Sequence, residues 1–160
     1  MEKQRGNWVI IMTFCFGFML VVMPLPKWVV TWRPDWIGMI LIYWCIAVPQ
    51  RVGIASGWLV GIICDILTDT LLGLHALSFC VLAYIASKLH RRIRIFPWWQ
   101  QASFVGILVA LVHLPEVWIL GMLGHPPIGW SFLHPSVTSI VLWHWLFIIL
   151  RDVRRFYKVT

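Results

Sequence analysis

The stretch that decides the fold runs from residue 53 to residue 73 and reads Gly53-Ile-Ala-Ser-Gly57-Trp-Leu-Val-Gly61-Ile-Ile-Cys-Asp65-Ile-Leu-Thr-Asp69-Thr-Leu-Leu-Gly73. Glycine or aspartate recurs at every fourth position of an otherwise apolar run. On an α-helix this spacing makes a narrow face of small residues that continues into carboxylates. Small residues four apart let two helix backbones approach closely inside a bilayer. The stretch therefore predicts a membrane-embedded helix that packs against another helix.

The composition supports a membrane setting. Of the 160 residues, 61% are hydrophobic and only 12% are charged, and the mean hydropathy is +0.84. A soluble domain carries about a quarter charged residues, so this balance excludes one. The chain is expected to be an integral membrane protein.

The apolar runs predict an all-α fold, with six transmembrane helices in one compact bundle and one domain over residues 1–160. The second span is the doubtful one, because residues 36–48 cover only about 20 Å as a helix and a hydrocarbon core is about 30 Å thick. The first is expected to be a retained span, since its apolar run continues without a cleavage site. The spans are placed near residues 8–23, 36–49, 53–72, 74–88, 100–123 and 135–150.

The distribution of positive charge predicts the orientation. With six spans and both termini in the cytoplasm, all of the 13 Lys and Arg residues except Lys27 and Arg33 lie inside, as the positive-inside rule requires. These residues flank the span ends, where attraction to anionic membrane lipids explains them and nucleic-acid binding is not expected. One group is predicted to form a cytoplasmic basic loop, with an acidic partner left open, and consists of Lys88, Arg91, Arg92 and Arg94.

The four-residue series divides by depth. In a span over 53–72, Asp65 lies about 4 Å from the centre and Asp69 about 10 Å from it. A central carboxylate costs about 2.5–3.5 kcal/mol on insertion scales, so Asp65 is expected to be buried and paired, with Asp69 near the outer interface. We predict that Gly57, Gly61 and Asp65 form one helix-docking strip and that Asp69 is a further partner contact. Docking within the chain and docking of another chain both stay open.

An enzymatic interpretation of the same residues fails on its ligands. Gly61-x3-Asp65-x3-Asp69, with Arg51 upstream, matches the tail of the signature of CDP-alcohol phosphotransferases. Phosphoryl transfer with two metal ions needs more anionic ligands than two. The segment 45–51, where the paired upstream acids should lie, has no carboxylate. We therefore expect no enzyme and no catalytic residue.

Cysteine and histidine are scattered, and neither predicts a metal or a cofactor. The four cysteines fall one to a span without a CxxC pair and are expected to be small buried residues. His125 and His134 share the last predicted outer loop. Two histidines without a third ligand do not make a metal site.

Three further charged residues are secondary candidates. Glu116 lies inside the fifth span beside Pro115 and three residues after His113. We expect it to pair with a neighbouring helix, and a proton relay with His113 stays open. Asp35 suits an N-cap of the second span, and Arg33 suits a lipid phosphate.

Taken together, several short motifs carry a resemblance to a known family. They are Trp32-Arg33-Pro34-Asp35-Trp36, Leu41-Ile-Tyr-Trp44 before Pro49-x-Arg51-Val52, Gly57-x3-Gly61-x3-Asp65-x-Leu67-x5-Gly73, and Leu142-Trp-x-Trp145 before Arg151-x2-Arg154. The chain resembles the rod shape-determining protein MreD family over essentially its whole length.

The resemblance implies a non-enzymatic scaffold of the bacterial cell inner membrane that helps to organise peptidoglycan synthesis and rod shape. Its implied direct partner is MreC, a single-span protein with a periplasmic domain. MreB, RodA and a class B penicillin-binding transpeptidase are implied in the wider complex. The implied fold is similar to the six-helix substrate-binding subunits of vitamin transporters. That similarity keeps open an alternative, a small-molecule-binding or transport subunit that uses Asp65 or Glu116.

Overall fold

A computed structural model describes residues 5–124 and 129–159 of the chain. Over these residues the chain forms helices and no strand, so the predicted all-α class is confirmed for the part described. The elements in chain order are α1 (Arg5–Val22), α2 (Lys27–Val30), α3 (Trp36–Ala47), α4 (Ile54–Thr68), α5 (Leu74–Ile93), α6 (Trp98–Met122), the 3-10 helix η2 (Gly129–Leu133) and α7 (His134–Phe156).

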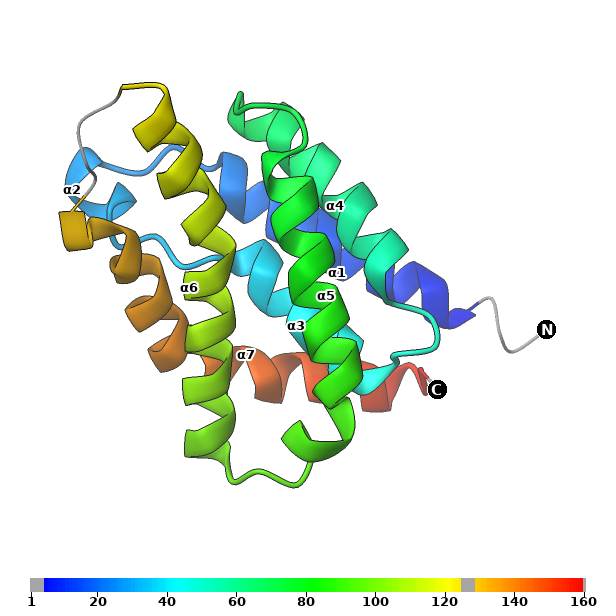
Figure 1. Cartoon of the computed structure of the whole chain (residues 1–160). Coiled ribbons are helices and arrows are strands. Elements are labelled where there is room, and N and C mark those ends of the chain that lie inside the picture. The colour runs from blue at the N-terminus through cyan, green and yellow to red at the C-terminus, as the bar shows by residue number, and fades with distance from the viewer. Residues whose placement is uncertain (1–4, 125–128, 160) are drawn as a thin grey trace.

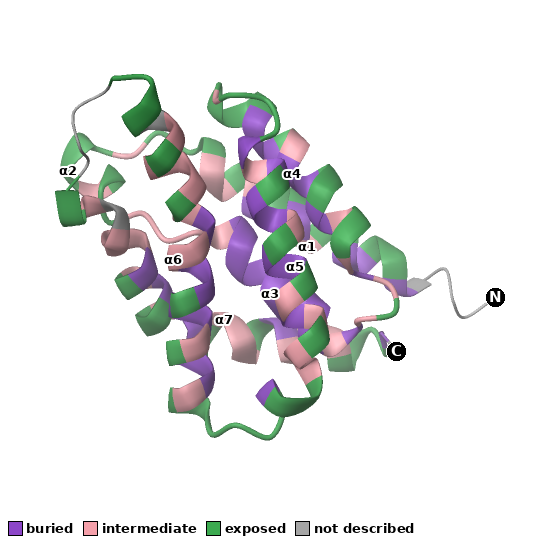
Figure 2. Ribbon diagram, in the orientation of Figure 1, coloured by how far each residue is buried: buried purple, intermediate pink, exposed green. Residues whose placement is uncertain are grey.

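The short helix α3 is the centre of the bundle. Every residue from Ile37 to Ile46 is buried, and α1, α5, α6 and α7 all pack against it (Figures 1 and 2). A helix that is apolar around its whole circumference is stable when protein surrounds it on all sides. The doubtful second span is therefore the core of the fold.

The length of α3 follows from that position. Its 12 residues cover about 18 Å, well short of the hydrocarbon thickness of a bilayer. Because α3 contacts protein around its circumference, its length need not match the lipid. The helix stops at Ala47, two residues before the predicted end at residue 49.

The outer faces of the surrounding helices carry the apolar side chains that lipid would contact. Among the described residues, two segments are long and apolar enough to cross a bilayer by length and composition, Trp98–Ile119 and Gly129–Phe156. Large exposed side chains include Trp8, Phe16 and Trp118. This apolar surface is typical of a membrane protein. The number of transmembrane spans, six, stays a prediction.

The two ends of the described chain meet at one end of the bundle. A Cβ atom built on Gly6 would lie 2.7 Å from Arg51 Nη1 and 3.2 Å from Val159 Cγ1. The beginning of α1, the α3–α4 connection and the C-terminal residues are thus neighbours. After the orientation predicted from the sequence, we call this the inner end, which also holds the α5–α6 connection, and the opposite end the outer end (Figure 1).

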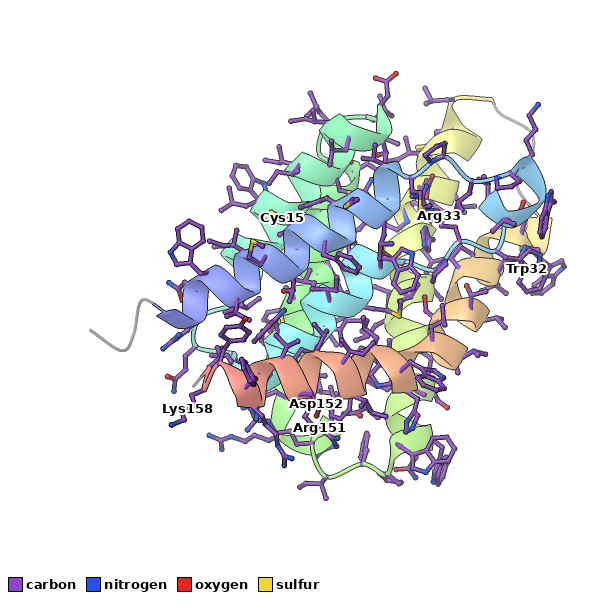
Figure 3. The ribbon with its side chains drawn as sticks, turned by 180° about the vertical axis from the view of Figure 1, so that it is seen from behind. Cys15, Trp32, Arg33, Arg151, Asp152 and Lys158 are labelled. Atoms are coloured by element: carbon purple, nitrogen blue, oxygen red, sulfur yellow. The ribbon has the colours of Figure 1, made fainter. Side chains whose placement is uncertain are left out.

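Two sequence-based predictions are wrong in detail. The residues Lys88, Arg91 and Arg92 lie on the last turns of α5, which continues to Ile93, and not in a loop. Positive side chains suit the last turn of a helix, where they complement its dipole. Cys15 is exposed on α1 rather than buried, whereas Cys45 and Cys64 are buried and Cys80 is intermediate (Figure 3).

Candidate functional site

The glycines of the four-residue series lie against the next helix of the same chain. A Cβ atom on Gly57 would meet Phe79 O at 2.6 Å and Ala83 Cβ at 3.0 Å. On Gly61 it would lie 2.6 Å from Ala76 N. Real Cβ atoms do not approach so closely, so only glycine permits this contact between α4 and α5. The structure therefore places the strip inside a helical hairpin.

Asp65 completes that hairpin at its outer end. The residue is 1% exposed, and its carboxylate accepts hydrogen bonds from the backbone N–H groups of Gly73 (2.9 Å), His75 (3.0 Å) and Ala76 (3.4 Å). These groups open α5 and have no partner within their own helix. Asp65 thus acts as an N-cap from the preceding helix, and its charge complements the positive end of the α5 dipole.

Two side chains fill the remaining acceptor positions of Asp65. Thr70 Oγ1 donates to Oδ1 at 3.1 Å, and His75 Nδ1 lies 2.8 Å from the same oxygen. Both carboxylate oxygens are therefore occupied by donors of the connection and of α5. Within residues 5–124 and 129–159, no three His, Cys, Asp or Glu side chains form a group that would hold a metal ion. The cluster is arranged to hold two helices together.

The series leaves the helix after Asp65. Asp69 is the C-cap of α4 in the left-handed conformation, with φ of 52°, and it is exposed. Gly73 is the N-cap of α5, with φ of 101°. At the other end, Gly53 is the N-cap of α4. Only Gly57, Gly61 and Asp65 therefore share one face of a helix.

Arg33 and Asp35 cap two other helices at the outer end. Arg33 Nη2 donates to the carbonyl oxygens of Leu20 and Val21, the last turn of α1 (Figure 3). Asp35 is the N-cap of α3, as the sequence predicts, and accepts from Gly38 N at 2.8 Å. The Asp35 backbone N–H donates to Ser139 Oγ of α7 at 3.3 Å. The guanidinium of Arg33 is thereby directed at protein carbonyls.

Glu116 pairs with a histidine of its own helix. Its Oε2 lies 3.2 Å from His113 Nδ1, three residues earlier on α6. No hydrogen bond or ion pair links Glu116 directly to Asp65 in the described part of the chain. Pairing of Glu116 with a neighbouring helix stays a prediction.

Several buried polar atoms in three segments of the chain have no hydrogen-bond partner among the described residues. We call these residues together with Glu116 the outer polar cluster. It joins the α1–α3 connection, the middle of α6 and the start of α7. His125 lies outside the described residues. The unpartnered atoms are Arg33 Nε, Asp35 Oδ2, His113 Nε2, His134 Nδ1 and Ser136 Oγ.

The structure also reveals two helix contacts that no sequence pattern indicates. Arg94 donates from Nε to Ile46 O at 3.0 Å and from Nη2 to Ala47 O at 2.7 Å, so it caps the C-terminal end of α3. Trp44 Nε1 donates to Thr13 Oγ1 of α1 at 2.9 Å. Each partner lies tens of residues away, and residue type alone does not identify it.

The fold and its polar sites define a class. This is an all-helical membrane-protein bundle in which charged side chains cap helix ends around a central helix. Comparison with known proteins then gives the family, because the model of the rod shape-determining protein MreD family matches residues 2–153. The chain belongs to the MreD family, which has a role in cell shape.

A curated relative and the solved structures were compared as well. The rod shape-determining protein MreD of Haemophilus influenzae is 29% identical over 154 residues, which are 96% of this chain and 95% of the relative. No solved structure matches the chain. The proposed likeness to vitamin-transporter subunits therefore has no support from a solved structure.

Proposed function

We propose that this chain is a multi-pass scaffold of the bacterial inner membrane that binds the single transmembrane helix of MreC. In this proposal it crosses the membrane six times with both termini in the cytoplasm. It joins MreC to the elongation machinery of MreB, RodA and the class B transpeptidase, and so helps to organise peptidoglycan synthesis. Family membership over residues 2–153 supports the role in cell shape.

An apolar groove between α1 and α7 is the observation that carries the partner proposal. It has a volume of about 950 Å³, and the central helix α3 forms its floor. Met12 and Phe16 line one wall and Leu146 and Ile149 the other, with Ile40 between them. A helix with its side chains is about 10 Å wide, so about 12 Å of its length would fill this volume.

The groove is a better candidate for MreC than the glycine strip. Gly57 and Gly61 are covered by α5 of the same chain, so another chain would have to displace α5 to reach them. We propose that Gly57, Gly61 and Asp65 hold the α4–α5 hairpin together. Asp69, exposed at its outer end, remains a candidate contact for a periplasmic part of a partner.

A matched pair of variants tests the groove. Ile149 is 56% exposed in the groove, and Ile107 is 63% exposed on α6 outside it. Ile149→Trp fills the space, so we expect it to lower the amount of MreC that co-purifies with the tagged chain by about tenfold. Ile107→Trp should leave the amount unchanged. Both variants must be inserted in the membrane and monodisperse after purification. If equal amounts of MreC then co-purify with the two variants, the groove is refuted as the docking site.

A second candidate function rests on the outer polar cluster. Its unpartnered buried donors and acceptors are groups that a small polar ligand satisfies, as in other ligand sites. In this alternative Glu116 contributes and Asp65 does not, because its oxygens are already occupied. Native mass spectrometry of the purified chain tests it. A ligand that stays bound to the purified chain and is lost in Glu116→Gln would favour the transport function. If the chain shows only its ligand-free mass, even under the gentlest ionisation conditions, the transport function is excluded.

A further inference from the structure

The inner end of the bundle contains a cavity lined by four arginines. Its volume is about 600 Å³, and it lies between the C-terminal end of α3, the α5–α6 connection and the C-terminal half of α7. Within the described part of the chain, no Asp or Glu lines it. We call it the basic cavity. The arginines are Arg94, Arg151, Arg154 and Arg155.

The positive charge of the basic cavity is poorly neutralised by the protein. Among the described residues the one acid paired with these arginines is Asp152, whose Oδ1 lies 3.4 Å from Arg151 Nε and whose side chain is 61% exposed (Figure 3). The side chains of Arg154 and Arg155 form no hydrogen bond or ion pair within the described residues. Their positions three and four residues after Arg151 put all three on one face of α7. Like charges so close together are unfavourable unless an anion joins them.

Arg94 is held in place by the protein. Two of its nitrogens, Nε and Nη2, donate to the last carbonyls of α3. A guanidinium has five N–H donors, so further donors remain for a ligand. A fixed guanidinium is well suited to an oxyanion, because less side-chain freedom is lost on binding.

Aromatic side chains form the rest of the wall. Trp98 lies against His144, with ring centroids 5.6 Å apart, and Tyr43 and Phe147 line the cavity beside them. Trp143 is 1% exposed, and its indole N–H has no acceptor among the described residues. Tryptophan and tyrosine are typical of the depth at which lipid headgroups meet acyl chains. The wall therefore combines hydrogen-bond donors with apolar surface.

We propose that the basic cavity binds the phosphodiester headgroup of an anionic phospholipid. Arginines chelate phosphate oxygens with paired N–H groups, and basic pockets between membrane helices at the cytoplasmic side suit such headgroups. The acyl chains would leave over Ile46, Phe147 and Ile148, which line the same cavity. An acidic peptide would match the charge but would leave this apolar wall exposed to water. The leaflet follows from the proposed orientation, with the inner end in the cytoplasm.

The test compares two double variants that remove equal charge. Arg154→Gln with Arg155→Gln removes two of the three α7 charges from the cavity, whereas Arg91→Gln with Arg92→Gln removes two charges from the α5 helix end outside it. The full chain is placed in nanodiscs of phosphatidylcholine, and diphosphatidylglycerol is titrated and followed by tryptophan fluorescence and native mass spectrometry. We expect the first double variant to weaken lipid binding at least tenfold and the second to change it less than twofold.

The outcomes distinguish the possible ligands. Equal loss with both double variants would show general attraction to the membrane surface and would overturn the site. Displacement of the lipid by millimolar inorganic phosphate would show that the cavity recognises phosphate itself, whether free or esterified. Binding of a polyglutamate peptide in place of the lipid would overturn the proposal in favour of a protein partner.

A third variant, checked by size exclusion, tests whether a loss of lipid binding reflects the site or a loss of folding. Trp143→Phe keeps an aromatic ring in the wall and removes the unpartnered N–H together with part of the indole. We expect a loss of lipid affinity of about threefold with unchanged elution on size exclusion. MreC co-purification is measured on the same samples. Failure of the lipid site with intact MreC binding therefore leaves the scaffold proposal standing, and the reverse result leaves the lipid site standing.

Discussion

Replacing Asp65 by asparagine should loosen the α4–α5 hairpin. The change keeps the shape of the side chain but turns one oxygen into an N–H donor. The amide oxygen can keep the Oδ1 partners His75 and Thr70. The new NH2 group then faces the backbone N–H groups of Gly73 and Ala76, which Oδ2 accepted at 2.9 and 3.4 Å.

The size of the effect follows from those two contacts. A hydrogen bond to a charged group contributes about 1.5–3 kcal/mol, and a buried donor left unpaired costs a similar amount. The contact with Gly73 N–H at 2.9 Å is counted fully, and the longer contact with Ala76 N–H at 3.4 Å only in small part. We therefore expect Asp65→Asn to lower the free energy of unfolding by about 2–4 kcal/mol. Asp65→Ala, which removes every acceptor, should cost more.

The assay is unfolding of the purified chain in mixed micelles with increasing SDS, followed by tryptophan fluorescence. Asp69→Asn is the matched control, because Asp69 is exposed and its left-handed backbone conformation is one that asparagine adopts readily. We expect the control to shift stability by less than about 0.5 kcal/mol. If Asp65→Asn unfolds at the same SDS fraction as Asp69→Asn, the capping argument is refuted.

Four further outcomes follow from the packing. Gly61→Ala should destabilise the protein by about 1–3 kcal/mol because its Cβ would meet the α5 backbone. Gly121→Ala, in a helix with open space at the new Cβ, should be neutral or stabilising by up to about 1 kcal/mol; the same SDS titration measures both. Arg94→Gln should lower stability by about 1–3 kcal/mol through loss of the α3 carbonyl contacts, and equal stability would contradict the cap. Thr13→Val removes the acceptor of Trp44 and should cost about 1–2 kcal/mol, which urea unfolding in detergent would detect.

Much of the fold could be predicted from the sequence because apolar runs and their breaks are local signals. The helices α4 and α5 and the close contact at Gly57 and Gly61 follow from residue spacing. The predicted span is too long, since it runs to residue 72 although the helix ends at Thr68. A carboxylate that caps the next helix needs a connection, and periodicity does not reveal where that connection begins.

The partners of the charged residues could be predicted only in part. The N-cap role of Asp35 depends on neighbours in sequence, and the structure shows it. Arg33 and Arg94 instead reach carbonyls of other helices, a choice that depends on how the helices are arranged. Sequence identifies such a charge as needing a partner, and only the packing identifies the partner.

The central position of α3 bears on how the protein enters the membrane. A segment of 12 residues is too short to be stable alone in a bilayer, where about 20 apolar residues are needed. Its side chains meet α1, α5, α6 and α7 in the finished bundle, and three of these four helices are synthesised after it. The nascent α3 must therefore wait beside the insertion machinery, or lie shallow in the membrane, until later helices enclose it. The order of the helices along the chain therefore implies that the core of the bundle forms only after the later helices have been inserted around α3.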